Sequence, residues 1–172
     1  MSSRNLKIYL LDFIMDLRAE DAGFSFGLFS VQLVVALSGF MFGVAEYFIL
    51  KPKPMIIELT WQKAYVPALI FLVCTGFVEE LIFRGVLQRT AVEVLGWWGI
   101  VYVSLLFATL HVGFLSWVDV VFVFAVALFF GWVVKKTGSL FGVTLSHSIA
   151  SMVLYLGELY FSRAPQQSSL QL

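Results

Sequence analysis

Residues 66–87 read VPALIFLVCTGFVEELIFRGVL, and this stretch decides the fold class. The half from Val66 to Val78 carries no charge, and about 20 apolar residues are enough for a helix to span a bilayer. The second half then places Glu79, Glu80 and Arg84 close together. A charged residue at the centre of a membrane helix costs roughly 2.5–3.5 kcal/mol on insertion scales. We therefore predict a membrane helix whose three charges face protein or a wet cavity.

The composition of the whole chain is also that of a membrane protein. Of its 172 residues, 60% are apolar or aromatic and only 13% are charged, whereas soluble domains have about 45–50% and about 25%. The formal net charge is zero, so no global field attracts a polyanion. These values favour the lipid bilayer as the main partner and argue against nucleic acid as a partner.

Five apolar segments are candidates for spanning helices, at about residues 24–50, 65–88, 95–114, 117–134 and 140–161. Short connections join them, so we predict an all-α fold, a polytopic transmembrane bundle of about five helices over residues 24–161. An amphipathic or interfacial segment, residues 1–23, precedes this domain, and a polar tail, residues 162–172, follows it. A small excess of Lys and Arg on the side of the N-terminus favours a cytoplasmic N-terminus.

Helical spacing separates the three charges of the second segment into two groups. Glu80 and Arg84 lie four positions apart, so they share a helix face and can form an ion pair. Glu79 is rotated by about 100° from Glu80. If Arg84 pairs with Glu80, then Glu79 is left as a candidate general base.

Both histidines of the chain lie in other apolar segments, His111 four positions after Phe107 and His147 four positions before Ser151. Taken singly, each of these features has a structural explanation. Each histidine can be a packing residue, Glu80 and Arg84 can be a structural ion pair, and Ser151 can be a small residue that allows close helix packing. Taken together, they are ionisable groups on three helices that can converge in a bundle core. Because ionisable residues inside a membrane are functional by default, the set predicts a site.

The motifs resemble those of a known family. They are Phe77-Val-Glu-Glu-Leu-Ile-Phe-Arg-Gly85, then Phe107-x-x-x-His111, then His147-x-x-x-Ser151. This order is similar to that of the CPBP family (CAAX proteases and bacteriocin-processing enzymes, also called ABI), over about residues 61–156. Its best known members are the type II CAAX prenyl endopeptidases, which remove the last three residues of prenylated proteins. The resemblance implies an intramembrane endopeptidase that acts on a membrane-associated peptide or protein, and we expect it in the plasma membrane of a prokaryote.

The resemblance also implies a role for each catalytic position. Glu79 matches the carboxylate that activates water, His111 the histidine that assists it, and His147 a residue that helps to hold the oxyanion. The supporting positions are Glu80, Arg84, Ser151 and Phe107.

Ser151 departs from the family, which usually has asparagine or a similar polar residue there. Serine offers one short hydroxyl donor, whereas the asparagine amide offers two donors and a longer reach. Losing a donor to the oxyanion can cost about 10²–10³ in rate. The substitution leaves three outcomes open: a slow enzyme, an enzyme that recruits another donor, or a protein without proteolytic activity.

The His-Glu-x-x-His helix of zinc proteases is absent from the sequence, so the local spacing gives no strong zinc signature. We favour catalysis without a cofactor, because Glu79 and His111 can together serve as the base and no other obvious ligand stands out beyond His147. Zinc is the alternative, and Glu79, His111 and His147 would then hold it. Two other functions remain open: a non-catalytic immunity or assembly factor that keeps the motifs for structure, and haem ligation by the two histidines.

The predicted depths of the site residues in the membrane do not agree with one another. Hydropathy places His111 near the far end of its segment, whereas Glu79 and His147 lie nearer the opposite side of the membrane. At 1.5 Å per residue, the depths can differ by roughly 10 Å. The catalytic interpretation requires all three side chains to face one cavity.

Overall fold

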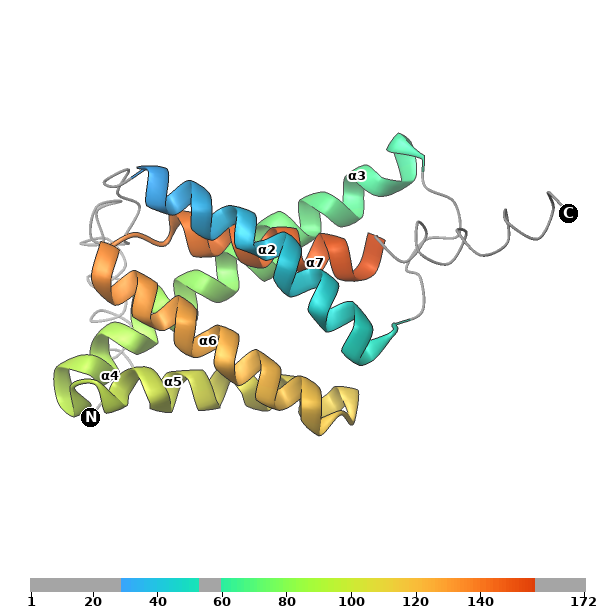
Figure 1. The fold of residues 1–172 in the computed structure, drawn as a ribbon. Helices are drawn as coiled ribbons and strands as arrows, with labels where there is room; N and C mark the ends of the chain where they lie inside the picture. The colour runs from blue at the N-terminus through green and yellow to red at the C-terminus, as the bar shows by residue number, and fades with distance from the viewer. Residues whose placement is uncertain (1–28, 53–59, 157–172) are drawn as a thin grey trace, which may run out of the picture.

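The computed structural model describes residues 29–52 and 60–156. The predicted N-terminal segment, residues 1–23, and the polar tail, residues 162–172, lie outside the described residues. Within the described ranges every regular element is a helix, as Figure 1 shows and as the predicted all-α fold requires. The elements are α2 (Phe29–Leu50), α3 (Trp61–Ile70), η1 (Phe71–Val78), η2 (Leu81–Leu87), α4 (Gln88–Leu95), α5 (Trp98–Thr109), η3 (Leu110–Phe114), α6 (Trp117–Thr137) and α7 (Phe141–Leu156).

Helix length and composition support a membrane bundle. In the described part of the chain, three helices are long and apolar enough to cross a membrane: Phe29–Leu50, Lys63–Leu95 and Trp117–Thr137. Two shorter apolar helices cover Trp98–Phe114 and Phe141–Tyr155. Many large apolar side chains remain on the outside, and soluble monomers rarely expose contiguous apolar areas of this kind. The predicted transmembrane bundle is confirmed.

The second helix is longer and less regular than the sequence predicted. It continues to Leu95 and ends at Gly96. The φ of Gly96 is 57°, a value that glycine adopts more readily than other residues. The polar residues after Leu87 mark the end of the apolar segment, but they do not break the helix. Two π-helical stretches, η1 and η2, flank Glu79 and Glu80. Such turns are rare and frequently occur at functional sites.

The third predicted helix divides into α5 and the short 3₁₀ helix η3, which contains His111. The next helix, α6, has defined ends. At its start, the Ser116 hydroxyl accepts a hydrogen bond of 3.2 Å from the Asp119 backbone N–H, which is the usual N-cap arrangement. At its end, Gly138 adopts a φ of 67°, the left-handed conformation in which glycine commonly ends a helix.

Helices α2 and α7 pack closely because small residues line their contact (Figure 1). A Cβ atom at Gly39 would overlap the backbone of Ser146, so no side chain fits there. Near the start of α7, the backbone N–H of Gly142 donates a hydrogen bond of 2.7 Å to Oε1 of the buried Gln32. Small residues allow close backbone approach in the same way in many membrane helix pairs.

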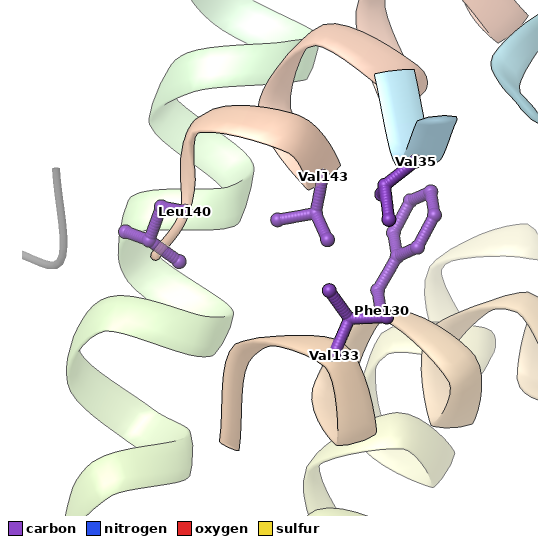
Figure 2. Close-up of a cluster of buried hydrophobic side chains, with 5 residues drawn as sticks. All are labelled: Val35, Phe130, Val133, Leu140 and Val143. Carbon is purple, nitrogen blue, oxygen red and sulfur yellow. The ribbon is translucent and has the colours of Figure 1, made fainter. Parts of the chain in front are cut away.

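A buried apolar cluster holds α6 against this helix pair. Figure 2 shows the cluster, in which side chains from three parts of the chain meet. Its buried members are Val35, Phe130, Val133, Leu140 and Val143. Together with the α2–α7 contact, this cluster fixes the relative positions of α2, α6 and α7, three of the helices that line the candidate site.

Replacing Gly39 by alanine tests the close contact between α2 and α7. The added methyl group meets the backbone of Ser146, which cannot move aside as a side chain can. We expect the free energy of unfolding to fall by about 1–3 kcal/mol, the usual cost of overpacking. The matched control is Gly113→Ala, because a Cβ there meets nothing within 4 Å. Denaturant unfolding in detergent measures both, and equal stabilities would contradict the packing described here.

Candidate active site

The predicted site residues meet at one cavity of about 380 Å³. Glu79, His111 and His147 all line it, and Ser151 does so as well. They come from three separate parts of the chain: the second helix, η3 and α7. The difference in depth suggested by hydropathy therefore does not keep the three side chains apart.

Glu80 lies behind the cavity, at the centre of a buried polar group. Its side chain is fully buried, and its Oε2 lies 3.2 Å from Nε of the buried Arg84. Its Oε1 lies 2.9 Å from Nδ1 of His147. The predicted ion pair between Glu80 and Arg84 is present, and Glu80 has a second partner that the sequence analysis did not identify.

The contact with Glu80 fixes the orientation of the His147 ring. An ionised carboxylate can only accept hydrogen bonds, so Nδ1 of His147 is the donor in this pair. The other ring nitrogen, Nε2, then points away from Glu80 and lies 4.0 Å from Oε2 of Glu79. His147 thus stands between the two adjacent carboxylates and is anchored by one of them.

The two carboxylates differ sharply in access. The side chain of Glu79 is 34% exposed, whereas that of Glu80 is 0% exposed. At 4.0 Å, Glu79 is too far from His147 for a direct hydrogen bond. Its carboxylate thus lines the cavity without a direct hydrogen bond to His147.

Phe107 packs at the junction of the charged and imidazole groups. The Arg84 guanidinium carbon lies 4.4 Å from the centre of the Phe107 ring, within the range of a cation–π contact. The same ring lies 5.7 Å from the His147 ring and 5.8 Å from the His111 ring, between centroids. The phenylalanine that precedes His111 in the motif thus contacts the buried cation and both histidines.

Two carboxylates that the sequence analysis left outside the site lie close to His111. Within the described residues, one group of possible metal ligands has donor atoms within 4.8 Å of one another, and it consists of Glu46, His111 and Asp119. Glu46 also lines the cavity. A signal was present in the sequence, because each is a lone charge in an apolar segment.

The three sequence motifs meet at one cavity, and comparison with known proteins supports their assignment to one family. A family model described as type II CAAX prenyl endopeptidase Rce1-like matches residues 60–153, which is more than half of the chain and includes all three motifs. The chain belongs to this family. The resemblance to the CPBP proteases is thereby confirmed. The matched residues include the helices that line the cavity, with the exception of α2.

A relative of this Rce1-like chain occurs in Bacillus subtilis (strain 168). It is the uncharacterized protein YpbD, which is 37% identical over 95 residues, or 54% of this chain and 47% of YpbD. The chain thus spans about half the length of the curated relative it matches. No solved structure matches the chain significantly.

Proposed function

We propose that this protein is an intramembrane endopeptidase that cleaves a membrane-associated peptide or protein with an activated water molecule. The observation that carries the proposal is the convergence of Glu79, His111 and His147 on one cavity among apolar helices. The substrate chain would enter from the bilayer, since the cavity lies within the membrane bundle. The Bacillus relative supports the plasma membrane of a prokaryote as its location.

Glu79 is the base in this proposal. It accepts a proton from water as the water oxygen forms a bond to the peptide carbonyl carbon. The carbon–nitrogen bond then breaks, and the proton passes to the leaving amine. A positioned general base of this kind typically contributes about 10²–10⁴ in rate. His111 lines the same cavity and assists in holding the water.

His147 supplies a donor to the oxyanion. Its Nδ1 proton is already committed to Glu80 at 2.9 Å, so donation from Nε2 requires the doubly protonated ring. The contact with the buried carboxylate of Glu80 holds the ring so that Nε2 lies toward Glu79. Glu80 therefore acts as a positioning residue, and Arg84 holds its other carboxylate oxygen, with Nε 3.2 Å from Oε2.

The test is a library of membrane-anchored peptides, offered to proteoliposomes that contain either the wild type or the Glu79→Gln variant. We expect cleavage products with the wild type and a near absence of them with the variant. Mass spectrometry identifies the cleaved bonds, and thermal unfolding checks that both proteins are folded. Equal product formation by the two proteins would contradict the proposal. If a folded Glu79→Ala protein instead supports the biological role fully, a non-catalytic factor is the better explanation.

A further inference from the structure

A second group of polar side chains beside the cavity contains residues that can bind a metal ion. We propose that Glu46, His111 and Asp119 bind a divalent transition metal, with zinc as the best fit. One donor atom from each residue lies within 4.8 Å of the other two. They come from three elements, because Glu46 is on α2, His111 on η3 and Asp119 on α6.

Buried polar atoms without hydrogen-bond partners support this site. Asp119 is fully buried, and neither of its carboxylate oxygens has a hydrogen-bond partner within the described structure. The buried Nδ1 of His111 is also without one. An isolated buried carboxylate is very costly unless it is paired or coordinates a metal. A cation between these side chains would give a partner to one carboxylate oxygen of Asp119 and to the His111 ring.

The donor set suits a zinc-type ion. Imidazole nitrogen and carboxylate oxygen are both zinc ligands, and sites with three protein ligands keep a fourth position open for water. Two carboxylates balance the charge of a divalent cation, which matters in an apolar bundle where net charge is costly. Tetrahedral ligands at 2.0–2.2 Å from zinc lie about 3.4 Å apart, so small side-chain rotations bring the three donors into place.

The site lies at one end of the bundle, where the C-terminal end of α2 meets the N-terminal end of α6 (Figure 1). His111 belongs both to this site and to the proposed proteolytic site, and its ring has two nitrogens to serve them. Glu46 and Asp119 take no part in the proposed proteolysis. The inference goes beyond that function, and metal binding can be measured without any substrate.

The experiment uses the full chain, purified in detergent, stripped with a chelator and dialysed. Isothermal titration with Zn²⁺ alone measures affinity and stoichiometry for the wild type, Asp119→Asn and Glu46→Gln. Glu93→Gln is the matched control, because Glu93 is an exposed carboxylate on α4. Glu79→Gln distinguishes this site from a metal held by Glu79, His111 and His147.

We expect one Zn²⁺ per wild-type chain and a rise in its thermal unfolding temperature on binding. Asp119→Asn and Glu46→Gln should each weaken binding by more than the 10–100-fold typical of changes around a metal's ligands. Glu93→Gln and Glu79→Gln should bind as the wild type does. If Asp119→Asn fails to fold, Glu46→Gln decides. The proposal is overturned if the wild type binds no Zn²⁺, which is the result expected if the two carboxylates share a proton instead of a metal ion. It is also overturned if Glu79→Gln loses Zn²⁺ binding as fully as Glu46→Gln does.

Discussion

Replacing Glu80 by leucine is expected to lower the free energy of unfolding by about 3–5 kcal/mol, the cost of breaking one side of a buried ion pair. Arg84 is 2% exposed, and its charge would lose the carboxylate that lies 3.2 Å from Nε. The stacking of its guanidinium on Phe107 does not replace an opposite charge. Denaturant unfolding in detergent measures the change.

The double variant Glu80→Leu/Arg84→Met separates stability from function. Replacing both members of a buried pair by apolar residues of similar size is often neutral or stabilising, so we expect stability to return close to that of the wild type. Cleavage should not return, because Nδ1 of His147 has lost the carboxylate that orients it. A stable double variant with full activity would show that Glu80 has only a structural role.

Changing Ser151 to asparagine is expected to raise the rate of cleavage by about 10²–10³-fold, the usual effect of one oxyanion donor. Ser151 lines the cavity on the same face of α7 as His147, one helical turn away. The asparagine amide reaches further than the serine hydroxyl and carries two donors. Single-turnover rates with the best library peptide measure the effect.

Ser151→Leu is the control for side-chain size, since leucine resembles asparagine in shape but has no donor. We expect no gain in rate from it. An equal gain from leucine and asparagine would point to packing and not to a hydrogen bond. If neither variant changes the rate, the oxyanion lies elsewhere in the cavity.

The features that could be predicted from the sequence are those that depend on local spacing or on composition. The pair of Glu80 and Arg84 lies within one helical turn, so its geometry follows from the helix alone. The apolar segments likewise identify the helices, because a bilayer requires a minimum length. The start of α6 at Trp117 followed in the same way from the apolar pattern.

The features that were missed depend on tertiary contacts. His147 lies 67 positions from Glu80. No local sequence pattern indicates which nitrogen of the His147 ring faces Glu79 and which faces Glu80. The π-helical stretches around Glu79 have no compositional signature, so a regular helix was the default expectation. Glu46 and Asp119 each lie near the end of an apolar segment, where a charge is usually tolerated, whereas the fold buries Asp119 completely.

In the proposed mechanism, Glu79 activates a water molecule, which attacks the peptide carbonyl carbon directly. It is tested most directly by a single turnover in ¹⁸O-enriched water with enzyme in excess, stopped with acid at early times. Covalent catalysis by a serine or a carboxylate leaves an acyl-enzyme that such a quench can trap. We expect ¹⁸O in the new carboxyl terminus of the peptide, an unchanged protein mass at every time, and loss of the product in Glu79→Gln. A protein mass raised by the acyl fragment, whether on Ser151 or on Glu79, would contradict it.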